Sequence, residues 1–311
     1  MGAFSVVENL GKIPPKYLIL EHLLEFRTDL YKLKVPILLL SPISRDVNQW
    51  YHEFEQSILS AFETRNFKPV LRASDGEYRF LLGTQPPSLR EKFSRWPLLF
   101  AKYLGSKILE KRSGFAGQTA PGISVGVYSA DELKRGREVF AKGVLYVLQH
   151  GQLAAHLQFA PEPFQECYHP AFKRFLDGHG AELAADNYVP FYFVYLFLSR
   201  VATAGLLRGR RILLINGASE PKRKAIDARF ERYGALETRW VGLSKDRSLF
   251  DRIALSEGDL GSDICFLGGG VGKFNLIQQL GNFPGPVIDA GYYFEAWANP
   301  EIAHRRPLCI V

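Results

Sequence analysis

Residues 70–83 read VLRASDGEYRFLLG, and they are the starting point for predicting the fold. The apolar run from Lys68 to Leu71 predicts a strand, and the apolar residues that return after Glu77 predict a helix. Small residues and two carboxylates separate the two patterns. We therefore expect a strand, a tight turn and a helix, with Asp75 and Glu77 at the carboxyl end of the strand. Open α/β sheets bind their ligands at that edge.

The acidic pair itself has two interpretations. Two carboxylates that are two residues apart diverge on a helix but can converge in a turn. Gly76 between them lacks the Cβ that would block an unusual backbone angle or an approaching ligand. Carboxylates completed by water and phosphate are typical ligands of Mg²⁺ or Mn²⁺. The simpler interpretation, which the spacing alone favours, is an acidic turn in which Asp75 caps the following helix.

The composition is that of a soluble globular protein with a large core, because 47% of the 311 residues are hydrophobic and 23% are charged. A net charge of +7 and a pI near 9.2 favour anionic partners such as nucleotide phosphates, acidic glycans or an anionic membrane face. No zinc-finger spacing or RNA-binding signature accompanies this charge, so we expect no nucleic-acid partner.

The cysteines and the apolar runs indicate in which cellular compartment the protein is found. Cys167, Cys265 and Cys309 lie far apart in the sequence, which fits a reducing compartment rather than a disulfide framework or a metal site. No secretory signal is recognisable at the start. The longest apolar run, residues 188–207, is interrupted by proline and arginine and predicts a buried helix rather than a membrane span. We expect a cytoplasmic protein, with peripheral contact to the inner face of a membrane left open.

The chain divides into two predicted regions. Residues 1–66 carry helical patterns and are expected to form an N-terminal helical extension. Residues 67–311 alternate strand and helix patterns, which predicts an α/β domain with a mostly parallel sheet and helices on both faces. Specific expectations are a helix from about Asp46 to Thr64, a helix over 130–142, a strand over 144–148, irregular structure over 150–180, and a helix after Asp246 that runs through Leu255.

A second candidate site follows the apolar run 212–215, which predicts a fully buried strand. Asn216 and Gly217 begin a loop of small residues, and Lys222 lies in a basic first turn of the next predicted helix. Backbone N–H groups and the helix dipole at such a turn can hold phosphate. A solvated basic first turn explains the same residues equally well.

Two further strand ends carry small or acidic residues. The strand predicted over 263–267 ends in Gly268, Gly269 and Gly270, which allow a ligand or another backbone to approach closely, although a tight turn also explains them. The strand predicted over 286–289 places Asp289 at its carboxyl end. Right-handed βαβ connections would bring all these strand ends to one edge of a parallel sheet.

Another motif points to a different chemistry. Residues 122–126 form a G-x-S-x-G pattern centred on Ser124. A nucleophile elbow needs a sharp strand-to-helix turn, but β-branched neighbours place Ser124 in the middle of a predicted strand. A serine hydrolase is therefore the weakest alternative. The basic segment 89–112 is interpreted as a solvated helix face, with contact to an anionic acceptor or lipid surface as the alternative.

The ordered set of motifs resembles the GT-D class of glycosyltransferases. The resemblance rests on RASDGE at residues 72–77, which is similar to the R-x-G-D-G-E motif of that family. It continues with FLGGG at 266–270, which is similar to a late L-G-P turn. It ends with DAG at 289–291 and Glu295, which are similar to a terminal D-x-G followed by acidic and aromatic residues. In all it spans roughly residues 71–297.

The resemblance implies a Rossmann-like fold and a metal-dependent transfer of a sugar from a nucleotide-sugar donor. The donor expected first is a UDP-sugar. The acceptor would be a glycan, glycoprotein or lipid-linked molecule in surface polysaccharide or glycoprotein assembly. Asp75 and Glu77 would hold Mn²⁺ or Mg²⁺ and neutralise the departing diphosphate. The remaining expected site residues are Arg72 as a donor-binding residue, Asn216, Gly217 and Lys222 for donor phosphate or ribose, Gly268 and Gly269 for the nucleotide, and Asp289 for a sugar contact or as a catalytic carboxylate.

A rival from another class is a non-catalytic protein that binds nucleotides or sugars on the same fold, because a fold does not determine a function. It predicts ligand binding that survives Asp75→Asn and Glu77→Gln, without turnover of any donor. The sequence leaves the identity of the sugar, the stereochemistry of transfer and a homo-oligomeric state open.

Overall fold

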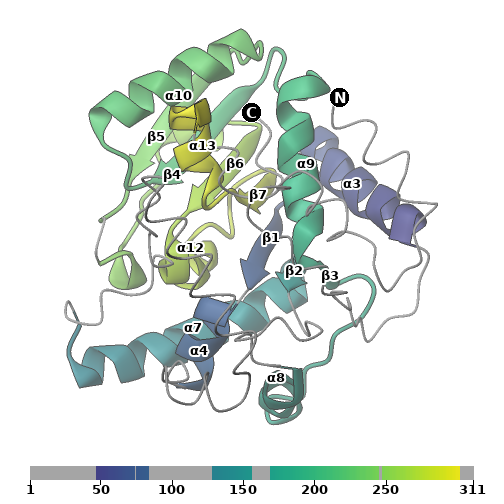
Figure 1. The fold of residues 1–311 in the computed structure, drawn as a ribbon, viewed down its shortest axis with the longest axis vertical. Coiled ribbons are helices and arrows are strands. Elements are labelled where there is room, and N and C mark those ends of the chain that lie inside the picture. Colours follow the sequence, from purple (N-terminus) through teal and green to yellow (C-terminus); the bar gives the residue numbers. More distant parts are fainter. Residues whose placement is uncertain (1–46, 74, 84–127, 156–168, 245–246, 302–311) are drawn as a thin grey trace, which may run out of the picture.

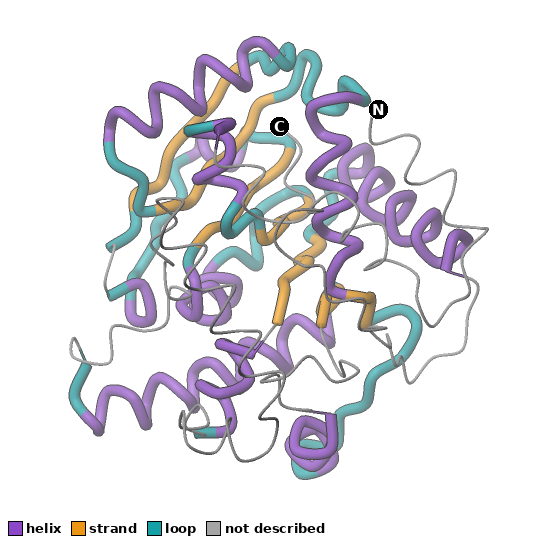
Figure 2. The backbone as a smooth tube through the Cα atoms, in the orientation of Figure 1, coloured by secondary structure: helices purple, strands orange, loops and turns teal. Residues whose placement is uncertain are grey.

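The computed structural model describes residues 47–73, 75–83, 128–155, 169–244 and 247–301 (Figure 2). Its strands are β1 (Lys68–Ala73), β2 (Gln152–Ala155), β3 (Tyr188–Pro190), β4 (Arg211–Asn216), β5 (Glu237–Gly242), β6 (Ile264–Gly268) and β7 (Pro286–Asp289). Its helices are α3 (Val47–Thr64), α4 (Asp75–Leu82), α7 (Ala130–His150), α8 (His169–Asp177), α9 (Phe191–Thr203), α10 (Glu220–Arg232), α11 (Glu257–Leu260), α12 (Lys273–Gln279) and α13 (Tyr293–Ala298), with short 3₁₀ turns η4 (Ser248–Phe250) and η5 (Gly270–Gly272).

The strands form a seven-stranded sheet in the order β3-β2-β1-β7-β6-β4-β5, and all paired strands are parallel. The prediction of a parallel α/β fold is confirmed, and the architecture is consistent with a Rossmann-like fold. Apolar runs such as Ile212–Ile215 of β4 are completely buried, as strands covered on both faces require.

Helices cover the sheet in two groups. α7 and α12 lie side by side, and both contact β1 (Figure 1). α9 also contacts β1 and packs against α3, while α10 packs against α13. Right-handed crossovers place α7 and α12 on one face and α9 and α10 on the other, because the first two lead toward the β3 edge and the last two toward the β5 edge.

α3 is the described part of the expected N-terminal extension, and its predicted bounds are confirmed. Trp50, Tyr51 and Phe54 are buried and pack against Phe193 of α9 with ring centroids 5.3 to 5.7 Å apart. The helix therefore shares the core of the sheet domain. No helix in the described ranges is both long and apolar enough to cross a membrane.

Three local predictions were wrong. Residues 144–148 belong to α7 instead of forming a strand, because Phe140, Val144 and Val147 bury one helical face and a short apolar run fits both patterns. The region 150–180 contains β2 and α8, so it is not wholly irregular. The segment through Leu255 holds η4 and extended chain, and the next helix, α11, begins only at Glu257.

At the carboxyl edge of the sheet, the ends of β1 and β7 separate. β1 pairs with β7 only as far as Val70 opposite Ile288, whereas it pairs with β2 through Ala73. In addition, the crossover from β4 leads to β5 and the crossover from β6 leads to β7, in opposite directions along the sheet. Such reversals create the crevices at which open α/β sheets bind ligands. The predicted convergence of the ends of β1, β4, β6 and β7 is confirmed.

Candidate functional site

The acidic motif begins a helix instead of preceding one. α4 starts at Asp75, so Asp75, Gly76 and Glu77 form its first turn. The first turn of α4 therefore lies where a tight turn was expected. Positions two apart on a helix do not share a face. Gly76 has no positive φ, and a Cβ added there would meet nothing within 4 Å. Gly76 therefore does not adopt the unusual backbone angle that its missing Cβ would permit, and the close approach of a ligand stays a prediction. The side chain of Asp75 lies outside the described part of the structure.

Glu77 forms an ion pair with a lysine that lies 196 residues away in the sequence. Lys273 Nζ lies 2.7 Å from Glu77 Oε1 and also 2.7 Å from Asp289 Oδ2. Lys273 is the first residue of α12 and follows the glycine run at the end of β6. Its side chain is only 5% exposed, and that of Glu77 is 15% exposed. The lysine thus joins α4 to the end of β7.

Asp289 accepts three hydrogen bonds from the two cations of this group. Its Oδ2 accepts hydrogen bonds from Lys273 Nζ and from the backbone N–H of Arg72, at 3.1 Å, and its Oδ1 accepts one from Arg72 Nη2, at 3.1 Å. The Arg72 amide lies beyond the last paired residue of β1 and β7. The carboxylate therefore replaces a strand partner at the point where the two strands separate.

Arg72 lies between the carboxylate and an aromatic surface of α9. Its guanidinium carbon lies 4.5 Å from the centroid of the Tyr195 ring and 5.5 Å from that of Phe191. Gly291 has a φ of +44°, and a Cβ added there would overlap Arg72 Nη2. The glycine of the DAG segment therefore leaves room for the guanidinium. In this structure Arg72 holds Asp289 in place, and a contact of Arg72 with a donor stays a prediction.

The ionisation of the group follows from its charges. Burial alone would raise the pKa of the Asp289 carboxyl, but Arg72 and Lys273 outweigh burial and lower that pKa below its ordinary value. Burial alone would lower the pKa of Lys273, but Asp289 and Glu77 raise it above its ordinary value. Asp289 and Lys273 therefore form a charged pair at neutral pH. A catalytic role of Asp289 stays a prediction, since it is 1% exposed and both its oxygens are engaged.

The ends of β4 and β6 are joined by a side chain. Asn216 Nδ2 donates a hydrogen bond to the carbonyl oxygen of Gly268 at 2.7 Å. A Cβ at Gly268 would lie 2.5 Å from this Nδ2, and one at Gly269 would lie 2.8 Å from Leu276 Cδ1. The protein's own side chains therefore account for the close approach at these two glycines. Their contacts with a nucleotide stay predictions.

Lys222 and Gly217 lie at the start of the next crossover. Gly217 follows β4 directly, and Lys222 lies in the first turn of α10. Lys222 Nζ pairs with both carboxylate oxygens of Glu295 on α13, at 2.7 and 2.5 Å. Both side chains are more than two-fifths exposed. The pair is therefore within reach of solvent and of an anionic ligand.

Among the described residues, a lysine occupies the position beside Glu77 where a divalent cation would bind. The ranges that the structure describes contain no group of three or more histidine, cysteine, aspartate or glutamate side chains able to hold a metal ion. Moreover, an ammonium group already lies between Glu77 and Asp289, and a second cation beside it would be repelled. A metal ion on Asp75 and Glu77 stays a prediction, and Lys273 competes with it.

Lys273 is the residue that sequence reasoning missed. It is the only charged residue between Asp263 and Asp289. The signal in the sequence was a single lysine at the start of an otherwise uncharged helix, after a strand and a glycine run. Long charged side chains are rarely buried without a partner, so this pattern could have predicted a buried ion pair.

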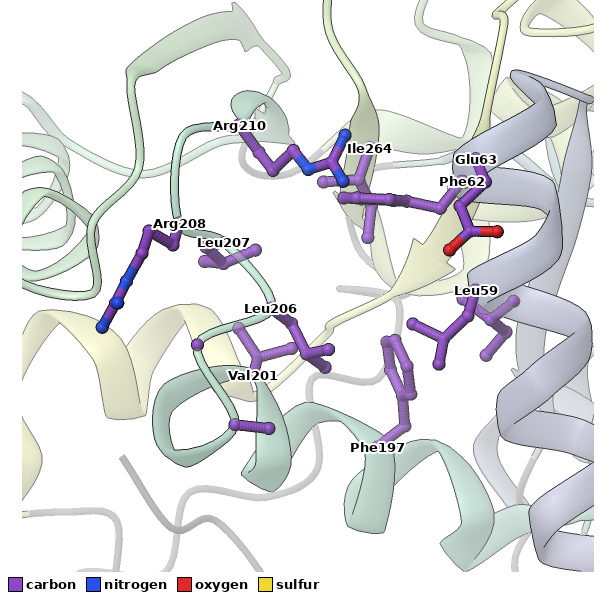
Figure 3. Close-up of a pocket in the computed structure, with 13 residues that line it drawn as sticks. Leu59, Phe62, Glu63, Phe197, Val201, Leu206, Leu207, Arg208, Arg210 and Ile264 are labelled. Atoms are coloured by element: carbon purple, nitrogen blue, oxygen red, sulfur yellow. The ribbon is translucent and has the colours of Figure 1, made fainter.

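Other features lie outside this edge. A pocket of about 320 Å³ lies near the opposite ends of the strands, between α3, α9 and the segment before β4 (Figure 3). Its lining includes Phe62, Phe197 and Ile264, with Arg210 stacked on Phe62 at 4.6 Å from the ring centroid. Cys265 is buried and unpaired by a disulfide. Ser124 and the basic segment 89–112 lie outside the described residues.

Comparisons with protein-family models, with curated proteins and with solved structures found no match to this chain. The resemblance to GT-D glycosyltransferases therefore stays a prediction.

Proposed function

We propose that this protein is a glycosyltransferase that moves a sugar from a nucleotide-sugar donor to a glycan, glycoprotein or lipid-linked acceptor. The observation that carries the proposal is the convergence of strand ends. Glu77, Asp289, Asn216 and Gly268, which come from four separate segments of the sequence, lie at the carboxyl edge of one parallel sheet. That edge, where crossovers reverse direction, is the usual ligand site of such folds.

The geometry suggests how a donor would be held. The point between β4 and β6 where the crossovers reverse direction is bordered by the Asn216 side chain and by the first turn of α10, a helix of 13 residues. Backbone N–H groups and the dipole at a helix start attract phosphate. Lys222 in this turn adds a positive charge that exchanges its partner Glu295 for phosphate oxygens. The sugar would then extend toward Glu77 at the end of β1.

Charge on the departing nucleoside diphosphate must be neutralised for transfer to proceed. The resemblance assigns this task to Mn²⁺ or Mg²⁺ on Asp75 and Glu77. The described residues instead offer the α10 N-terminus and Lys222 near the proposed phosphate position. A UDP-sugar as donor, the acceptor classes and the role in surface glycan assembly rest on the resemblance alone.

The proposal is tested by thermal-shift measurements with UDP, GDP, ADP and their sugar derivatives, each with EDTA and with Mn²⁺. A ligand at 100 times its Kd stabilises the folded state by about 2.7 kcal/mol, so a specific nucleotide should raise the midpoint clearly. Lys222→Met should weaken binding about tenfold, since it removes a charged hydrogen bond. The matched control is Lys224→Met, which removes an exposed lysine of the same helix and should bind like the wild type.

Turnover separates the enzyme from the rival binding protein. The nucleotide-sugar that binds best is incubated with the protein, and release of free nucleoside diphosphate is followed with and without candidate acceptors. Acceptor-dependent release supports the transferase. Binding without any release would favour the non-catalytic protein, and the absence of binding by every nucleotide tested would refute the proposal.

A further inference from the structure

Lys273 occupies the position between the two acidic segments of the candidate site. Its Nζ is equally distant, at 2.7 Å, from an oxygen of Glu77 and an oxygen of Asp289. The residue is 4% exposed, so water screens its charge poorly. The backbone of Lys273 is held because it is the first residue of α12. Its ammonium group is held by ion pairs with carboxylates from α4 and β7.

Among the four described residues of this cluster, the charges balance. Arg72 and Lys273 carry two positive charges, and Glu77 and Asp289 carry two negative charges. A buried cluster of this kind is tolerated because each charge has an opposite partner. A divalent cation bound to Glu77 would add two positive charges beside the ammonium group, and it would also have to displace the lysine from its carboxylate.

We propose that Lys273 is the cation of this edge and occupies the place that a divalent ion on Asp75 and Glu77 would need. Glu77 is then a partner of Lys273 that positions α4 against α12, and it binds no metal. As far as it concerns catalysis, this inference rests on the proposed function. It follows that binding of a nucleoside diphosphate requires no divalent cation at Glu77, and that the α10 N-terminus and Lys222 meet the phosphates.

The inference is tested first without any nucleotide. Mn²⁺ is titrated into wild-type protein at neutral pH, and free Mn²⁺ is measured by electron paramagnetic resonance. We expect no Mn²⁺ site that is sensitive to Glu77→Gln. Lys273→Met should create one, because it removes the ammonium group that lies 2.7 Å from Glu77. We expect at least a tenfold gain in Mn²⁺ affinity, which the double variant Lys273→Met/Glu77→Gln loses. Lys224→Met is the matched control and should bind Mn²⁺ as the wild type does.

If Lys273→Met fails to fold, Mn²⁺ binding to the wild type and to Glu77→Gln still tests the inference. One Mn²⁺ bound at micromolar concentration to the wild type, and lost in Glu77→Gln, would overturn it. The nucleotide thermal shifts then separate the two proposals. A shift that persists in EDTA supports both. A shift that needs Mn²⁺ and disappears in Glu77→Gln supports the transferase but overturns the role of Lys273. Failure of every nucleotide refutes the proposed function and leaves the Mn²⁺ result standing.

Discussion

Asp289→Asn is the change that tests the ionic cluster most directly. The substitution keeps the size of the side chain but removes its negative charge. Asp289 accepts two hydrogen bonds from Arg72 and one from Lys273. An asparagine has only one acceptor oxygen for these three donors, and its NH₂ group would face a donor. Arg72 and Lys273 would then share Glu77 as their remaining anion within the cluster.

The expected decrease in the free energy of unfolding follows from the loss of the Asp289 charge. Removing one member of a buried ion pair costs about 3 to 5 kcal/mol, because it leaves an uncompensated buried charge. Asp289 is 1% exposed and its partner side chains are 5 to 6% exposed, so little solvent screening reduces this value. The loss is a large fraction of the ~5 to 15 kcal/mol by which a typical domain is stable.

Urea unfolding of the wild type and the variant measures the effect. With an m-value of about 3 kcal/mol/M, the midpoint should fall by about 1 to 2 M. Asp177→Asn is the matched control, because Asp177 pairs with Lys173 on the surface of α8 and is 57% exposed; its loss should change stability by about 0.5 kcal/mol or less. If Asp289→Asn cost no more than this control, the described cluster would not be a buried ionic network.

A double variant separates charge from shape. Lys273→Met in the Asp289→Asn background removes the cation that lost its partner, so the two costs should not add. We expect a coupling of about 1 to 3 kcal/mol, as for residues in direct contact within one network. Strict additivity would contradict the 2.7 Å contact between the two side chains.

Three further outcomes follow from the same geometry. Folding lowers the pKa of Asp289 below its ordinary value of 3.8. The stabilisation by its carboxylate is therefore complete above pH 3.8 and is lost as the pH falls through the folded-state pKa. In urea titrations, the difference in stability between the wild type and Asp289→Asn should narrow below about pH 4. Gly291→Ala should lower the free energy of unfolding by about 2 kcal/mol or more, because it adds a Cβ at positive φ against Arg72; unchanged thermal stability would count against this packing. Gly76→Ala should keep or raise stability by up to about 1 kcal/mol, since it lies in a helix with open space around it; if a ligand passes close to Gly76, the same variant should lose nucleotide-sugar binding in the thermal-shift assay.

The strand ends could be predicted from the sequence because buried parallel strands are nearly continuous apolar runs. Ile212–Ile215 shows this pattern without interruption, and Asp289 follows the shorter apolar pair Val287 and Ile288. The positions of Asn216 and Asp289 at the carboxyl edge followed from these runs. Only the chirality of the crossovers was needed to bring these ends together. The order of the strands was not available in the same way, since it depends on contacts between distant segments.

The errors have a shared physical cause. Residues 144–148 are apolar enough for either a strand or a helix, and tertiary packing of α7 against α12 decides between them. The D-G-E segment could form a turn or a first helical turn, and nothing local distinguishes the two. The ion pair between Glu77 and Lys273 spans 196 residues, so no spacing rule reveals it.

Burial of charge does not by itself mark a functional site in this protein, and a second buried ion pair shows why. Arg200 of α9 pairs with Glu55 of α3, and Glu55 is 6% exposed. That pair joins two helices that cover the sheet, so it is explained as a link between them. The Arg72–Asp289–Lys273–Glu77 cluster differs in its location, because it lies where β1 and β7 separate at the carboxyl edge. Apolar residues could replace a buried ion pair at little or no cost in stability. Since this edge is where open α/β sheets usually bind their ligands, we propose that the cluster has a functional role in addition to its contribution to stability.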